Sequence, residues 1–127
     1  MSERADYIRG LRTLAQLLAD NPDLSLPYDG PTERIAQTIF IIGGPSPVTQ
    51  ALLYVQAMDE PPTMELKRQS PDLTWLDIKG RIEGLHVRLH LWAREVCEPI
   101  EPYRAADGSV HKWAIPAELR AVAGGDA

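Results

Sequence analysis

The chain has 127 residues, of which 44% are hydrophobic and 24% charged, and these values predict one globular domain over residues 1–127. Thirteen basic and eighteen acidic residues give a formal net charge of −5, which argues against a general nucleic-acid binder. The single cysteine, Cys97, excludes an internal disulfide and a cysteine-rich metal site, and it favours a reducing, cytoplasmic setting. We expect neither a signal peptide nor a membrane span, because no apolar run approaches the required length.

The first third of the chain predicts a helix followed by a strand. Residues Glu3 to Asp20 have the spacing of an amphipathic helix, which Asn21-Pro22 ends. Thr38 to Ile42 form a continuous apolar, β-branched run, which predicts a central strand covered on both faces. The apolar face expected for the helix consists of Ile8, Leu11, Leu14, Ala15, Leu17 and Leu18.

A second helix and a further strand precede the middle of the chain. Ser46-Pro47 has the residue types of an N-cap and a first helical residue, so the helix is expected from there to about Asp59, before Pro61-Pro62. Thr63 to Arg68 predicts a strand that leads through Ser70-Pro71-Asp72 into the next element.

Residues Leu73 to Val96 predict one long β-hairpin, around which the rest of the chain is organised. Apolar and polar residues alternate with period 2 on both sides of Glu83-Gly84. A two-residue turn there, or a four-residue loop of the same parity, directs one apolar row inward. The inward pairs would be Leu76 with Leu91, Ile78 with Leu89, Gly80 with Val87 and Ile82 with Leu85, and the outward pairs Trp75 with Trp92, Asp77 with His90, Lys79 with Arg88 and Arg81 with His86.

After the hairpin, Pro99 and Pro102 break the strand and bend the chain toward another sheet edge. We expect a turn at Asp107-Gly108, a short strand from Val110 to Ile115, a short helix from Pro116 to Ala123 and a frayed tail over 121–127. The predicted fold class is therefore α+β, in the order α-β-α-β-β-β plus a short C-terminal strand and helix. It consists of an antiparallel sheet of about four strands with two helices packed on one face.

Three features together resemble a group of small uncharacterised proteins of actinobacteria, their phages and mobile elements. They are the first helix with its "NPDLSLP" loop (21–27), the strand-helix unit, and the hairpin that closes on "VRLHLWAREVCEPIE" (87–101). The comparable segments of that group look like "LADFLEAHPELPVP" and "VTLDVYAPREQVCERV". The resemblance covers about residues 7 to 101, and Ala93 to Glu98 is its most specific piece. It implies a phage or mobile-element setting and carries no enzymatic activity.

The outward row of the hairpin is the candidate site. In two structural interpretations, the protein's own helices or C-terminal segment cover the tryptophans, or the charges lie in open water. In the functional interpretation, the row binds another protein or a second copy, because Trp and Arg are frequent at binding hot spots. The acidic residues Asp20, Asp23, Asp29 and Glu33 would complement it in a homodimer, and a nucleic-acid platform is the alternative. The predicted partner-binding residues are Trp75, Lys79, Arg81, Arg88 and Trp92.

No motif indicates an enzyme, a metal or a cofactor. Asp77 beside His90 has the residue types of an acid–base pair, but Cys97 would lie roughly 20 Å or more from His90 along a strand. His86 and His90 on one strand face, with His111 elsewhere, do not form a zinc motif. Gly43-Gly44-Pro45-Ser46 resembles a phosphate-binding loop but lacks its Lys-Ser/Thr, and we interpret it as a turn. We therefore predict a non-enzymatic accessory protein that acts through protein–protein contacts, with a nucleic-acid-associated or regulatory protein as the alternative.

Overall fold

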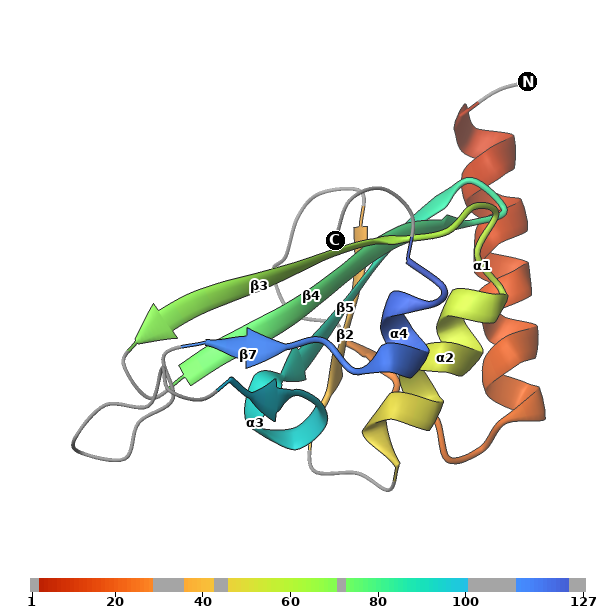
Figure 1. Ribbon diagram of the computed structural model, residues 1–127. Helices are drawn as coiled ribbons and strands as arrows, with labels where there is room; N and C mark the ends of the chain where they lie inside the picture. The colour runs from red at the N-terminus through yellow and green to blue at the C-terminus, as the bar shows by residue number, and fades with distance from the viewer. Residues whose placement is uncertain (1–2, 29–35, 43–45, 71–72, 101–111, 124–127) are drawn as a thin grey trace.

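The computed structural model describes residues 3–28, 36–42, 46–70, 73–100 and 112–123, and it confirms the α+β class (Figure 1). The main sheet has the strand order β1-β2-β5-β4-β3. Four of its strands are long, and β1 has only two residues. Figure 1 shows the helices α1, α2 and α4 together on one side of this sheet. The bounds are α1 Glu3–Asp20, β1 Pro27–Tyr28, β2 Ala36–Ile41, α2 Pro47–Gln56, β3 Thr63–Ser70, β4 Leu73–Ile82 and β5 Leu85–Trp92.

The hairpin of β4 and β5 has the predicted register along its whole length. Glu83 and Gly84 have φ angles of 50° and 86°, and two consecutive positive φ angles are typical of the two-residue type I′ turn. Each of the eight predicted cross-strand pairs is present, from Ile82 with Leu85 to Trp75 with Trp92. The C-terminal limit at Val96 was wrong, because the chain leaves the sheet after Trp92 and forms the short helix α3 (Ala93–Val96).

The strand β2 pairs in parallel with β5, so the prediction of an entirely antiparallel sheet was wrong. The reason is the connection through α2. A helical crossover returns the chain to the end of the sheet where β2 began, so β3 runs in the same direction as β2. Two antiparallel pairings then give β5 that direction too. Coverage on both faces was also wrong, because Ile39 and Ile41 are fully buried while Phe40 is 36% exposed.

The helix α1 has its predicted bounds, and Leu11, Leu14, Leu17 and Leu18 of its predicted apolar face pack on the core. Ile8 and Ala15, also expected there, are exposed, and Gly10 is buried instead. A β-carbon at Gly10 would lie 2.2 Å from the β-carbon of Leu85 and 2.6 Å from the carbonyl oxygen of Ile82. The absence of a side chain at Gly10 therefore lets the helix approach the turn end of the hairpin.

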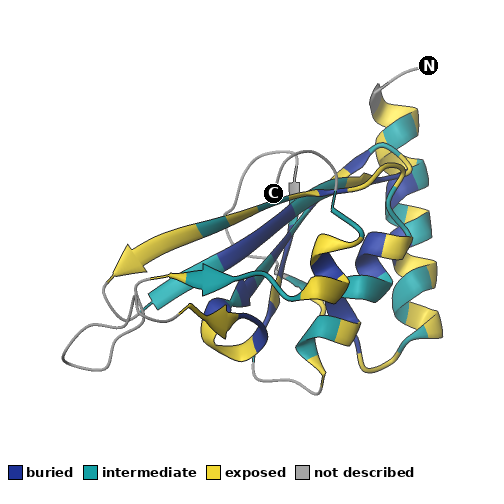
Figure 2. Cartoon of the chain, in the orientation of Figure 1, coloured by how far each residue is buried: buried dark blue, intermediate teal, exposed yellow. Residues whose placement is uncertain are grey.

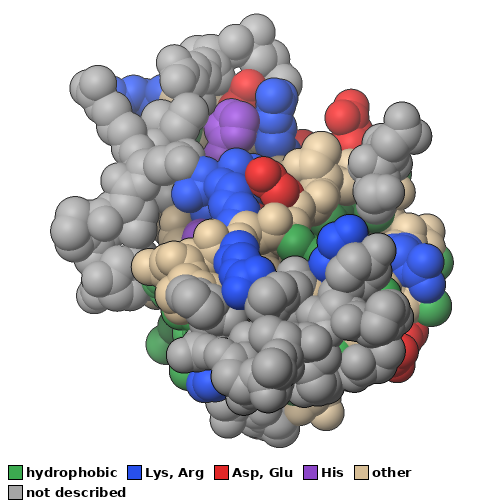
Figure 3. Space-filling model, turned by 60° about the vertical axis from the view of Figure 1, so that its left-hand side comes forward, with side chains coloured by type: hydrophobic (Ala, Val, Ile, Leu, Met, Phe, Trp, Pro, Cys, Tyr) green, Lys and Arg blue, Asp and Glu red, His purple; other side chains and the backbone are tan. Residues whose placement is uncertain are grey.

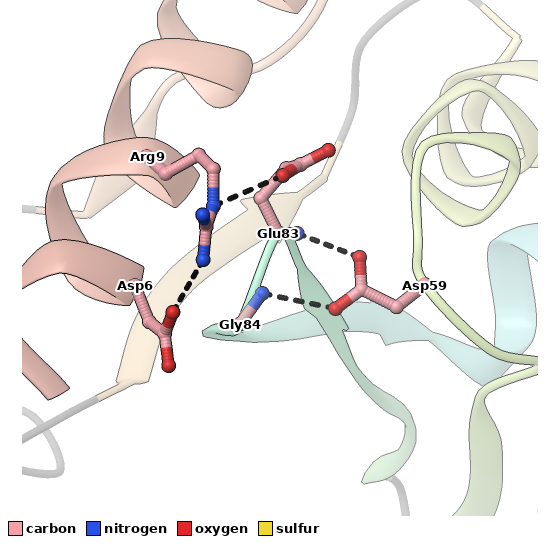
Figure 4. Close-up of polar contacts among 5 residues, drawn as sticks. All are labelled: Asp6, Arg9, Asp59, Glu83 and Gly84. Carbon is pink, nitrogen blue, oxygen red and sulfur yellow. Dashed lines mark hydrogen bonds and ion pairs between the residues drawn. The ribbon is translucent and has the colours of Figure 1, made fainter. Parts of the chain in front are cut away.

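The helix α2 ends at Gln56, three residues before the predicted limit, because Asp59 binds the hairpin turn (Figure 4). The carboxylate of Asp59 accepts hydrogen bonds from the backbone N–H groups of Glu83 at 2.7 Å and Gly84 at 2.9 Å. Arg9 of α1 pairs with Glu83 at 3.2 Å and also with Asp6. The helix α1 and the segment that follows α2 thus hold one turn.

Ser46 occupies the N-cap position of α2, as predicted, but its side chain makes no capping hydrogen bond. Its backbone has the left-handed conformation, with φ 49°, and its carbonyl oxygen accepts the N–H of Gln50 at 3.0 Å. The rest of the turn predicted before α2, residues 43–45, lies outside the described residues.

The end of the chain forms a second, two-stranded sheet instead of joining the main one. The strand β6 (Glu98–Pro99) pairs with β7 (Trp113–Ala114), and α4 spans Ala117–Arg120. The strand β7 and the helix α4 are both shorter than predicted. The predicted turn at 107–108, the first part of the predicted strand (110–111) and the end of the tail (124–127) lie outside the described residues.

One hydrophobic core lies between the sheet and the helices. The inward hairpin residues Ile78 and Leu89 are fully buried, as are Tyr54 of α2 and Leu119 of α4. Figure 2 shows β3 as the exposed edge of the sheet, beside the buried β4. Among the described helices, none combines the length and the apolar character needed to cross a membrane.

Candidate functional site: the outer face of the sheet

The face of the sheet opposite the helices carries the outward residues of four strands, and we call it the outer face. Because paired residues project to the same side, the registers arrange it in rows across β3, β4, β5 and β2. The rows change in character along the strands, from aromatic to acidic to basic. They are Lys67-Trp75-Trp92, Glu65-Asp77-His90-Phe40, Thr63-Lys79-Arg88-Thr38 and Arg81-His86.

One end of the outer face is an aromatic cluster of four rings, Phe40, Trp75, His90 and Trp92. Phe40 stacks on His90 with centroids 5.1 Å apart, and Trp75 meets Phe40 edge-on at 6.1 Å. Trp75 lies 5.8 Å from His90 and 5.9 Å from Trp92. These separations are those of favourable aromatic pairs, so the rings form one rigid, partly exposed platform.

Two polar side chains fix the edges of the aromatic cluster. The guanidinium of Arg94, from α3, lies 4.0 Å above the ring of Trp92, which is the geometry of a cation–π contact. The indole N–H of Trp75 donates to the side-chain oxygen of Gln69 at 2.6 Å. Arg94 is exposed, so a cation and an aromatic surface are presented side by side.

The carboxylate of Asp77 lies at the centre of the outer face and is 2% exposed. Its two oxygens are 3.2 Å from the ammonium of Lys67 and 2.9 Å from Nδ1 of His90. Burial by itself would raise the pKa of Asp77, but the hydrogen bonds and charges of His90 and Lys67 outweigh it and lower the pKa. Asp77 therefore remains an anion that holds side chains of three strands together.

The other end of the outer face is a basic cluster of Lys79, Arg81, His86 and Arg88. Arg81 and His86 are exposed, and Lys79 and Arg88 are partly buried. Figure 3 shows one side of the molecule on which Lys and Arg side chains adjoin a histidine and a carboxylate. Within the described parts of the chain, Lys79 and Arg81 form no ion pair.

The structure brings all five predicted site residues to the outer face. Trp75 and Trp92 lie in the aromatic cluster, and Lys79, Arg81 and Arg88 lie in the basic cluster. Sequence reasoning missed Phe40 and Arg94 as members of the site. Phe40 reaches it only through the parallel pairing of β2 with β5, and Arg94 only because the chain turns into α3.

Cys97 lies outside this site and is buried. Burial raises the pKa of its thiol to about 12, so very little reactive thiolate exists near neutral pH. Within the described residues, no three His, Cys, Asp or Glu side chains are grouped to hold a metal ion. The outer face thus presents an aromatic surface, cations and one buried anion.

Comparison of the chain with models of protein families, with curated proteins and with solved structures finds no match. Its function is accordingly argued from the geometry of the outer face.

Proposed function

We propose that this protein is a non-enzymatic accessory module that binds another protein, or a second copy of itself, through the outer face of its sheet. The observation that carries the proposal is the partly exposed aromatic cluster on the side away from the helices. Tryptophan and arginine contribute strongly at interfaces because a rigid, amphipathic side chain buries a large area at little entropic cost.

The arrangement of the aromatic cluster supports this role. Phe40 is 36% exposed although it is stacked on His90, and Arg94 lies over Trp92 in solvent. A partner that covers these groups would bury apolar surface and desolvate a preformed cation–π pair. Because the rings already pack on one another, little side-chain freedom would be lost on binding.

The proposal gives Asp77 and His90 a structural part instead of a catalytic one. The carboxylate is almost inaccessible and is already held by Lys67 and His90. The thiol of Cys97, the nucleophile considered from the sequence, is buried and protonated. The pair thus orients the ring of His90 against Phe40.

The second candidate function is association with nucleic acid, and the basic cluster favours it. Exposed Arg81 and partly buried Lys79, on the same face as the stacked rings, resemble the cation-and-aromatic surfaces that bind single strands. The net charge of −5 opposes it. Retention on immobilised single-stranded DNA that falls steeply as salt rises would favour this candidate, since phosphate contacts release counterions.

The setting we propose is the cytoplasm of a host that carries a phage or mobile element. It rests on the resemblance of residues 7 to 101 and on the single cysteine. Self-association would use the exposed Asp20, the last residue of α1, and Asp23, just after it, as the acidic complement of the basic cluster. The other two acidic residues considered, at 29 and 33, lie outside the described residues.

The experiment compares the parent protein with Trp92→Ala and with the control Tyr7→Ala, which removes a 42% exposed ring from α1. Each protein is immobilised, incubated with a host lysate and analysed by quantitative mass spectrometry, and its mass in solution is measured by light scattering. We expect Trp92→Ala alone to lose the captured partner or the dimer, with little change in the free energy of unfolding. Unchanged capture and unchanged mass for Trp92→Ala and for Phe40→Ala would contradict the proposal.

A further inference from the structure

A hollow of about 370 Å³ lies at the turn end of the outer face, beside the basic cluster. Lys79 and Arg81 of β4 and His86 of β5 line it, together with Thr63 at the start of β3. The segment between α2 and β3, Asp59 to Pro61, forms its rim. The hollow is thus built from three neighbouring strands and a connection that crosses their ends.

The cations around this hollow form no ion pair with the described residues. Elsewhere on the molecule, Lys67 is paired with Asp77 and Arg9 with Glu83. By contrast, Lys79, Arg81 and His86 have no carboxylate partner in the part of the chain that the structure describes. The nearby Asp59 directs its carboxylate at the backbone N–H groups of Glu83 and Gly84.

We propose that this hollow receives the carboxylate of an acidic side chain from the protein partner. The proposal rests on the proposed function and names the chemistry of the partner. The planar guanidinium of Arg81 matches a carboxylate with two parallel hydrogen bonds, and Lys79 adds a second charge-assisted contact. The partner is therefore a protein segment that carries an Asp or Glu.

The acidic residues between α2 and β3 make the hollow more favourable for a single anionic group than for a polyanion. Asp59 and Glu60 lie directly beside the cations. A nucleic-acid backbone carries a phosphate at every nucleotide, so its neighbouring charges would meet these carboxylates. An isolated carboxylate brings a single charge, which Lys79 and Arg81 can contact while the carboxylate of Asp59 is held by the backbone of the turn. This arrangement favours an acidic protein segment over nucleic acid.

The distance between the hollow and the aromatic cluster defines the spacing of the partner's groups. Trp75 and Lys79 are four positions apart on β4, which corresponds to about 13 Å, and Trp75 and Arg81 are six positions apart, about 20 Å. An extended partner segment would therefore place an apolar side chain on the aromatic cluster and an acidic one four to six residues away.

The test uses a glycine-serine peptide with a single glutamate, inorganic phosphate and a ten-nucleotide thymidine strand as separate probes, followed by backbone amide shifts in NMR. We expect the peptide to shift the amides of Lys79, Arg81 and His86 saturably. The double variant Lys79→Gln/Arg81→Gln should bind it at least about tenfold more weakly. The control Arg12→Gln, which removes an exposed cation from α1, should bind as the parent does.

Equal peptide binding by the parent and the double variant would overturn the proposal, as would tighter binding of phosphate or of the thymidine strand at the same amides. The outcome is separable from that of the proposed function. If Trp92→Ala loses partner capture and the double variant retains it, the proposal for the hollow is refuted and the proposal for the protein-binding face stands. If the hollow binds the peptide but Trp92→Ala does not change partner capture, the proposal for the protein-binding face is refuted and the hollow stands as a carboxylate-binding site.

Discussion

The carboxylate of Asp77 is buried in the middle of the outer face, where Lys67 and His90 hold it and Glu65 is the other charged group opposite it. Its pKa is lower in the folded state than in the unfolded chain. The folded state therefore gains stability from the anion at pH values above the ordinary carboxyl pKa, about 3.9. That gain disappears as the pH falls through the folded-state pKa.

We expect Asp77→Asn to lower the free energy of unfolding at pH 7 by about 1–3 kcal/mol, because charge-assisted hydrogen bonds are lost in a buried site. The difference from the parent should shrink as the pH falls below about 4, because the unfolded parent then binds a proton that folded Asp77, with its lower pKa, binds only at still lower pH. Urea unfolding at pH 7, 5 and 3 measures it. Glu65→Gln, at a 63% exposed position on β3, is the control and should change little. A difference that stays constant with pH would show that the charge of Asp77 has no part in it.

Among the elements, the contact between α1 and the hairpin depends on one missing side chain. Gly10→Ala should improve the intrinsic helix propensity by about 1 kcal/mol. We nevertheless expect a net loss of stability of about 1–3 kcal/mol, because the new β-carbon would lie 2.2 Å from that of Leu85 and force the two elements apart.

Thermal unfolding of Gly10→Ala measures this loss. The reverse substitution at an exposed position of the same helix, Ala15→Gly, separates the two effects, because it changes propensity alone. A stabilised Gly10→Ala would mean that α1 does not touch the hairpin turn.

The sequence predicted those elements whose register depends on local pattern. The alternation on both sides of Glu83-Gly84 was sufficient to place Trp75 opposite Trp92 and Asp77 beside His90. It was not sufficient for β2, because a continuous apolar run such as Thr38–Ile42 carries no information on strand direction. Period 3.6 also identified α1 and most of its buried face, but it missed Gly10, since a glycine appears as a gap in the apolar stripe. Phe40 was missed as a site residue because the direction of β2 could not be predicted.

At the scale of the whole molecule, the inward residues of the hairpin belong to one hydrophobic core together with residues of all four helices. Leu89 is fully buried and pairs with Ile78 on one side and Ile39 on the other. We expect Leu89→Ala to lower the free energy of unfolding by about 2–5 kcal/mol, by lost burial and a residual cavity. Urea unfolding measures it, with Leu26→Ala, at a 72% exposed position, as the control. Equal midpoints for Leu89→Ala and the parent would contradict a core centred on the hairpin.

The parallel pairing of β2 with β5 has a consequence for the order in which the molecule assembles. The strands β3, β4 and β5 follow one another along the chain, whereas β2 meets β5 only after a long loop has closed around α2 and the other two strands. Loop closure costs entropy before its contacts form, so we expect the three-stranded meander to be present in the folding transition state and β2 to dock afterwards. Phe40 arrives with β2. In a folding chain, Trp75 and Trp92 would thus pair early, and the aromatic cluster would be complete only after β2 has docked.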